Sequence, residues 1–164
     1  MCEDTRISKK LLSKYEIKSY LSDHQKIVKF LGGFSLETTP FVADKIGNFS
    51  DFVRSRTTIF ITFLPGSDYK ATITTAKKIN KEGLNPAPHF AARSISSKKM
   101  LEDYIARVTG EANVKKILLV GGDGKEQIGP FPETIIILET GILDKFVISE
   151  IGIAGNPVVS PDIP

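Results

Sequence analysis

Cysteine, tryptophan and long apolar runs are scarce or missing in this sequence, and their scarcity narrows the class of protein. Cys2 is the single cysteine among 164 residues, which excludes a disulfide within the chain and a cluster of thiolate metal ligands. A reducing compartment such as the cytoplasm is therefore expected. No apolar run approaches the ~20 residues that cross a bilayer, and the Leu11-Leu12 pair is too short for the core of a signal peptide. Membrane insertion and secretion are not expected.

The sequence also lacks a large excess of charge of either sign. The chain has 22 lysines and arginines against 19 aspartates and glutamates, and its net charge of +3 falls short of the basic stripe typical of nucleic-acid-binding proteins. A local basic group lies near the N-terminus, formed by Arg6, Lys9, Lys10, Lys14 and Lys18. Such a group is more typical of a solvated segment than of an RNA-binding arm. We therefore expect a basic lead-in with a short helix over residues 1–33, a globular domain over 34–164, and no nucleic-acid partner.

What the sequence does contain is a regular alternation of strand and helix patterns. Apolar or β-branched runs begin near residues 34, 57, 88, 116 and 150, and helical patterns separate them. Asp68 and Ser97 are expected N-caps, Pro132 a first helical residue, and Gly83 and Gly141 helix ends. This order predicts an α/β fold with a parallel sheet and right-handed crossovers. A doubly wound sheet and the first five units of a TIM-type (βα)8 barrel both remain possible.

Polar side chains follow four of the predicted strands at their carboxyl ends. These are Glu37, Thr62, His89 and Asp123. Because the carboxyl ends of parallel strands meet at one edge, we expect the four groups to gather around a polar ligand. Taken singly, each also has an ordinary structural interpretation, such as a helix cap for Glu37 or a buried core imidazole for His89.

The glycine-rich turn at residues 121–124 is either a phosphate cradle or a plain tight turn. It matches neither formal motif, because Leu119 and Glu126 break a P-loop and Gln127 breaks a dinucleotide fingerprint. No nucleophilic triad is evident, and two isolated histidines do not make a metal site. The phenylalanines near the strands are expected to be core residues; they are Phe34, Phe60, Phe63 and Phe90.

Five short motifs, taken in order, resemble a known family. They are FSLETTP at 34–40, FITFLPG at 60–66, PHFAAR at 88–93, LLVGGDG at 118–124 and IGIAGNP at 151–157. Together they resemble the first five strand ends of the methylenetetrahydrofolate reductase family. The resemblance spans roughly residues 34–163, and its strength lies in the order and spacing of the motifs.

The resemblance implies a flavin-dependent (βα)8 barrel, of which this chain would supply about the first five units. It implies interconversion of 5,10-methylenetetrahydrofolate and 5-methyltetrahydrofolate, with FAD relaying hydride from NADH, NADPH or another donor. Glu37 matches the family's acid, which helps to protonate the folate nitrogen. An apolar barrel mouth would favour the neutral carboxyl that such a proton donor needs. Asp123 matches a carboxylate near flavin and pterin.

The resemblance also assigns cofactor contacts. Thr62 and Phe63 match a Thr-Tyr pair beside the flavin and nicotinamide, and His89 matches a histidine that contacts the flavin. The remaining expected cofactor-binding residues are Pro65, Gly121, Gly122, Asp123 and Asn156. Three departures stand out: Thr38-Thr39 replaces two aromatic residues, Gly121 replaces an arginine, and Asn156 and Ser160 stand where the strand-five motif has Tyr and His.

The absence of the last three barrel strands from the matched region keeps other interpretations open. One interpretation is that the chain pairs with a complementing C-terminal half or with a second copy of itself. The alternatives are a catalytically inactive half-barrel that serves binding or assembly, and a doubly wound domain that binds a phosphorylated metabolite.

Overall fold

The computed structural model describes residues 24–122 and 126–154, and the chain divides into two compact units, residues 1–34 and 35–164. The first unit contributes helix α2, His24–Phe30. This helix confirms the helix predicted before the first strand. Each unit is described by itself. Among the described residues, no helix is both long and apolar enough to cross a membrane.

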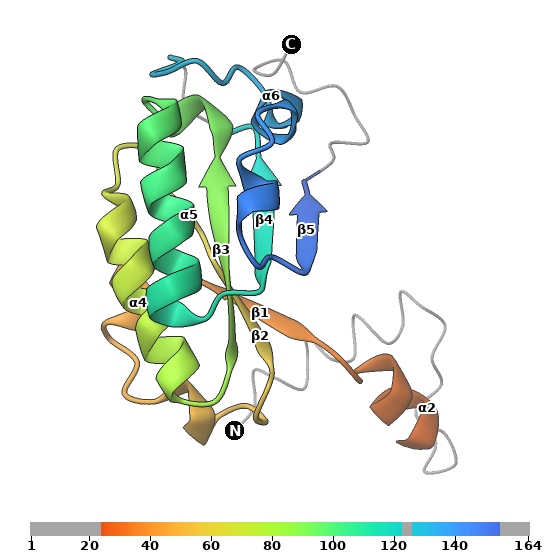
Figure 1. The fold of residues 1–164 in the computed structure, drawn as a ribbon. Coiled ribbons are helices and arrows are strands. Elements are labelled where there is room, and N and C mark those ends of the chain that lie inside the picture. Colours follow the sequence, from red (N-terminus) through yellow and green to blue (C-terminus); the bar gives the residue numbers. More distant parts are fainter. Residues whose placement is uncertain (1–23, 123–125, 155–164) are drawn as a thin grey trace. The chain divides into compact units, whose positions relative to one another are not determined.

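The second unit is built on a five-stranded, all-parallel sheet (Figure 1). Its strands are β1 (Ser35–Thr38), β2 (Thr58–Ile61), β3 (Asn85–Ala91), β4 (Lys116–Val120) and β5 (Glu150–Ile153). They lie side by side in sequence order, β1-β2-β3-β4-β5. A doubly wound sheet requires a reversal of strand order, which these five strands lack, so that expectation is wrong for the described sheet.

The helices between the strands include two long ones, α4 (Tyr69–Lys81) and α5 (Lys98–Ala112). Figure 1 shows both on the same face of the sheet. Shorter helices follow β1 and β4: α3 (Pro40–Ala43) and α6 (Thr134–Glu139). Three 3-10 turns lie in the described connections: Phe49–Asp51, Ala92–Ser94 and Leu143–Lys145.

The core lies between the sheet and the two long helices. Alternate strand residues that face these helices are fully buried: Ile59, Ile61, Phe90, Ile117 and Leu119. From the helices, Ile73, Ala76 and Ile79 of α4 and Leu101, Tyr104, Ile105 and Val108 of α5 fill the same layer. Tyr104 stacks on Phe90 with ring centroids 4.1 Å apart. Both long helices of this layer cover the same face of the sheet.

Several predicted helix ends are confirmed, and one is wrong. The Asp68 carboxylate accepts a hydrogen bond from the Lys70 N–H at 2.9 Å, and the Ser97 hydroxyl accepts one from the Met100 N–H at 3.1 Å. Gly83 and Gly141 have the positive φ expected after a helix. Pro132 is not a first helical residue, because α6 begins at Thr134 with Glu133 as its N-cap.

Strand β3 begins three residues earlier than predicted and contains two prolines, Pro86 and Pro88, although it lies between two partners. The register explains this. The Asn85 N–H donates to the Thr57 carbonyl, so N–H groups at odd positions point to β2 and those at even positions point to β4. Pairing with β4 begins only at His89. The prolines therefore remove no hydrogen bond from the ladder.

The loop that follows β4 lies against the exit of β3. The Ile128 N–H donates to the Arg93 carbonyl at 2.8 Å. A Cβ atom placed on Gly129 would lie 2.0 Å from the Ile95 carbonyl oxygen, so no side chain fits there without a backbone shift. This close approach fixes the carboxyl ends of two neighbouring strands relative to each other.

We predict that Gly129→Ala lowers the free energy of unfolding by about 1–3 kcal/mol, because the added methyl group collides with backbone. Gly110→Ala is the matched control: Gly110 lies in α5, and a Cβ there meets nothing within 4 Å. It should raise stability by about 0.5–1 kcal/mol, since alanine favours helix. Urea denaturation followed by circular dichroism measures both. Equal effects of the two substitutions would contradict the packing described for Gly129.

Candidate functional site

Three polar side chains from three consecutive strands share the face of the sheet opposite α4 and α5. Glu37 of β1 pairs in register with Phe60 of β2, which pairs with Ala87 of β3. Side chains two residues apart on a strand point to the same face, so His89 joins this set. The neighbouring positions Ile59 and Ile61 point to the helices and are fully buried. The structure therefore brings Glu37 and His89 to one face of the sheet, as predicted for the carboxyl ends of the strands. We call it the helix-free face because, among the described residues of 35–164, neither α4 nor α5 lies on it.

Thr62 is directly linked to Glu37. Its hydroxyl donates a hydrogen bond to the Glu37 Oε1 atom at 2.5 Å, and its backbone N–H donates to the Thr38 carbonyl at 2.8 Å. These two bonds hold the carboxylate against the end of β2. The Glu37 side chain is nevertheless exposed. The apolar surroundings expected for an acid at a barrel mouth are thus not supplied by the described residues.

His89 is the most deeply buried of the polar groups at this site, with 7% of its surface exposed. Burial lowers the pKa of its imidazole below the ordinary value of 6.5, and the nearby Glu37 carboxylate raises that pKa in partial compensation. The imidazole is therefore neutral near pH 7. Its backbone carbonyl accepts a hydrogen bond from the Tyr104 hydroxyl at 3.3 Å, which connects β3 to α5.

The Nε2 atom of His89 is buried and has no hydrogen-bond partner in the described part of the structure. A buried polar atom left unpaired costs roughly 1–3 kcal/mol. Native proteins rarely leave such an atom unpaired unless water, an ion or a ligand satisfies it. This nitrogen is thus an observation, independent of the sequence, that points to a ligand on the helix-free face.

The packing of β4 against β3 explains why glycines occupy the two positions after β4. The Gly121 carbonyl accepts a hydrogen bond from the Arg93 N–H at 3.1 Å. Gly122 has a φ of +97°, and a Cβ atom there would lie 3.3 Å from the Ala91 Cβ. Both residues therefore bring the end of β4 close to β3. Of the other expected site residues, Asp123 and Asn156 lie outside the described residues.

Phe63 and Pro65 lie in the connection between β2 and α4. Phe63 is half-buried and Pro65 is exposed. The connection turns after them, where Gly66 has a φ of +78° and the Ser67 N–H donates to the Leu64 carbonyl. None of the described contacts joins Phe63 or Pro65 to Glu37, Thr62 or His89. The structure therefore assembles three of the expected site residues and leaves these two apart.

Phe60 is a site residue that the sequence analysis assigned to the core. Its side chain is only half-buried, and its ring lies 5.9 Å from the His89 ring, tilted by 59°. The signal that identifies it is positional. Phe60 precedes Thr62 by two residues on the same strand, so its side chain shares the face of the site.

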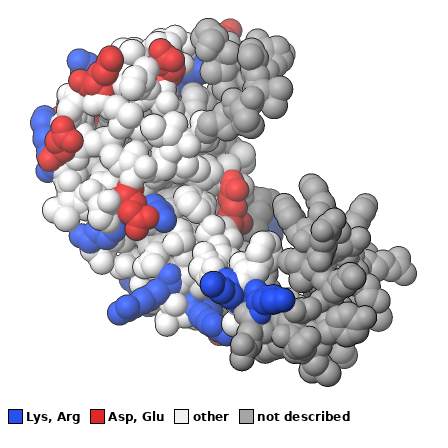
Figure 2. Space-filling model, turned by 90° about the vertical axis from the view of Figure 1, so that its right-hand side faces the viewer, with Lys and Arg blue, Asp and Glu red and all other residues white. Residues whose placement is uncertain are grey.

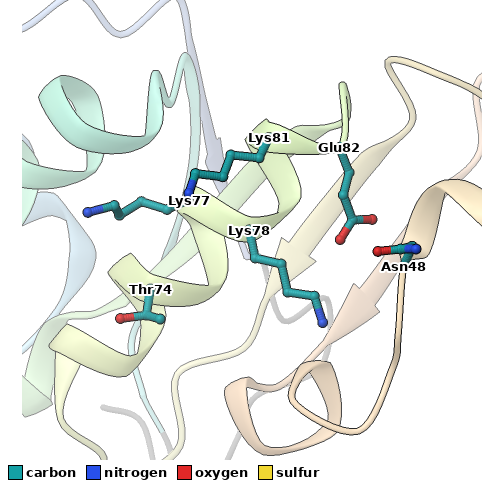
Figure 3. A pocket seen from close by; sticks show the side chains of 6 residues that line it. All are labelled: Asn48, Thr74, Lys77, Lys78, Lys81 and Glu82. Carbon is teal, nitrogen blue, oxygen red and sulfur yellow. The ribbon is translucent and has the colours of Figure 1, made fainter.

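A groove of about 450 Å³ with charged walls lies beside α4 (Figure 3). Two of its charged groups have partners in the neighbouring loop. The Lys78 ammonium donates to the Ala43 and Ile46 carbonyls, and the Glu82 carboxylate accepts from the Phe49 and Ser50 N–H groups. Figure 3 shows Lys77 and Lys81 extending away from Asn48, on the opposite side of the groove. The hydrogen bonds of Lys78 and Glu82 thus connect α4 to the loop before β2. The lysine side chains of the groove do not point to a common place where a ligand could bind (Figure 3).

On the upper and middle parts of the face drawn in Figure 2, acidic and basic side chains of the described residues lie interspersed, and basic side chains predominate on its lower part. Within the described ranges, no group of three or more His, Cys, Asp or Glu side chains could hold a metal ion. The helix-free face around His89 therefore remains the best-supported site.

No known family model matches this chain. The class of protein that the fold defines is an α/β domain with a sequentially ordered parallel sheet and a polar cluster on its helix-free face.

The buried imidazole predicts how stability depends on pH. Because the pKa of His89 is lower in the folded state than in the unfolded chain, the unfolded chain binds the proton first as the pH falls through about 6.5. The free energy of unfolding should therefore decrease below that pH. His89→Gln should remove this part of the slope. Urea titrations between pH 5 and 8 measure the difference. An unchanged slope in His89→Gln would show that His89 titrates normally.

Proposed function

We propose that this chain forms the first five units of a (βα)8 barrel in a flavoprotein similar to methylenetetrahydrofolate reductase. The reaction is the interconversion of 5,10-methylenetetrahydrofolate and 5-methyltetrahydrofolate, with NADH, NADPH or another electron donor. One observation carries the proposal: a carboxylate, a hydroxyl and a neutral imidazole with an unpaired nitrogen, from three consecutive strands, share one helix-free face.

The strand order supports the barrel part of this proposal. In a (βα)8 barrel every crossover is right-handed and every strand adds next to the one before it, so the helices form one outer layer. The described sheet has this order, and α4 and α5 lie on one face. The opposite face carries Phe60, Leu118 and Val120, which are only half-buried. Closure of the sheet would bury these apolar side chains inside the barrel.

The site residues fit a bound flavin and folate through ordinary polar chemistry. FAD, when bound, would supply hydride transfer between the nicotinamide and the folate methylene carbon. The unpaired His89 Nε2 atom would gain a hydrogen-bond partner from a polar cofactor or substrate atom. The backbone at Gly121 and Gly122 has no side chain to obstruct a flat ring.

Glu37 would act as the proton donor to the folate nitrogen. Thr62 holds its Oε1 atom and leaves the second carboxyl oxygen for the substrate. The carboxyl is exposed among the described residues. Ligands that cover it would exclude water and thereby favour its protonated form, which a general acid requires.

An assembly module without turnover is the second candidate, and exposed isoleucines on β5 favour it. Ile151 and Ile153 pair in register with Ile117 and Leu119 of β4, which are fully buried. The β5 residues are 43% and 54% exposed. Apolar side chains at these positions are typical of a surface that a further βα unit covers, whether or not the assembly performs chemistry.

The first experiment measures cofactor binding and turnover. The protein, alone and with any complementing partner, is titrated with FAD, and flavin fluorescence and the visible spectrum report binding. We expect a yellow complex whose flavin is reduced by 5-methyltetrahydrofolate. Glu37→Gln should lower the rate of the folate half-reaction by 10²-fold or more, as is typical of a lost general acid, and should leave nicotinamide oxidation intact.

Glu133→Gln is the matched control, because Glu133 is an exposed carboxylate whose side chain makes no capping hydrogen bond. It should change neither half-reaction. Equal loss of both half-reactions in Glu37→Gln would contradict the acid role. A colourless protein that binds no flavin but self-associates would favour the assembly module.

A further inference from the structure

The ring of Phe60 lies between the two titratable groups of the site. Glu37 is on β1, Phe60 on β2 and His89 on β3, and β2 is the strand between the other two. All three side chains point to the helix-free face. Phe60 is in register with Glu37, and its ring centroid is 5.9 Å from that of His89. The acid and the imidazole are therefore separated by an apolar ring.

This separation matters because a carboxylate and an imidazole that meet form an ion pair. Such a pair protonates the imidazole and occupies an oxygen of the carboxylate. Neither happens here. The Glu37 Oε1 atom accepts its hydrogen bond from Thr62, and the His89 Nε2 atom has no partner within the described residues. One carboxylate oxygen of Glu37 and the Nε2 atom of His89 therefore remain available to a ligand.

We propose that Phe60 is a positioning residue, whose ring prevents Glu37 and His89 from pairing with each other and keeps His89 out of water, so that both remain available to a ligand. The inference rests on the proposed function only for the identity of that ligand. Phe60 itself performs no chemistry in this proposal. It acts through the protonation state of His89 and the freedom of the Glu37 carboxylate.

The other described groups around His89 are apolar or are already paired, so Phe60 and Glu37 are the side chains that determine the protonation of its imidazole. On β4 the register partner of His89 is the apolar Leu118, whose own partner on β5 is Gly152. On α5 the Tyr104 hydroxyl bonds to the His89 carbonyl and not to its ring. At the far end of β4, the Lys116 ammonium is paired with Glu150 at 2.6 Å. Arg93 follows β3 in the 3-10 turn Ala92–Ser94. Among the described residues, Glu37 is the charge that acts on the pKa of His89.

The test is an NMR titration of the imidazole Cε1–H resonances in the full chain without added ligand. The sequence contains two histidines, so His89→Gln assigns both signals. Phe60→Ala should raise the titration midpoint of His89 by about one pH unit, because water and Glu37 reach the ring. Phe52→Ala, at a phenylalanine that is 78% exposed, should leave the midpoint unchanged.

A second pair of variants covers the case in which Phe60→Ala does not fold. Phe60→Leu keeps an apolar side chain, and we expect a smaller upward shift. Adding Glu37→Gln to either variant should reverse part of the shift, which a merely structural role for Phe60 would not produce. An unchanged His89 midpoint in the folded Phe60 variants would overturn the proposal. Because no flavin or folate is present, this outcome is independent of the cofactor titration that tests the proposed function.

Discussion

The handedness of the crossover connections between successive strands is the constraint on which this structure depends. A right-handed crossover to the next strand in the same direction always places its helix on the same face of the sheet. The described strands follow this rule without a reversal, so α4 and α5, the two long helices described for residues 35–164, both cover one face. Residues that alternate along each strand are thereby sorted into two environments: a dry layer beneath the helices, and a face where polar side chains keep access to a ligand.

This sorting explains how residues distant in the sequence form one cluster. Glu37, Phe60 and His89 are separated by more than 20 residues at each step, yet each step is one strand spacing. Adjacent strands lie about 4.8 Å apart, so groups on β1 and β3 would be within reach of each other if the middle side chain were small. The identity of residue 60 therefore decides whether the acid and the imidazole act separately or as an ion pair.

Much of the fold could be predicted from the sequence, because its patterns are local. Helix caps at Asp68 and Ser97, the apolar run of β4 and the glycine after α4 depend on neighbouring residues, and the structure has them where predicted. The start of β3 could not be predicted, because Pro86 and Pro88 oppose strand formation until the register shows which neighbour their missing N–H groups would face. For the same reason the site was found only in part: strand ends identify Glu37, Thr62 and His89, whereas the role of Phe60 depends on pairing across three strands.

The isoleucine side chains of β5 are exposed because no described element covers them. Its outward isoleucines have the same register positions as β4 residues that are fully buried, so the difference in exposure arises from cover and not from residue type. Burial of an isoleucine side chain stabilises a fold by about 1.5–3 kcal/mol, and an uncovered strand edge leaves backbone groups unpaired. A further parallel strand with its helix would satisfy both needs. In the barrel that we propose, the same addition would extend the helix-free face toward closure, near the unpaired nitrogen of His89. Under that proposal, one structural unit would both cover the β5 edge and complete the site.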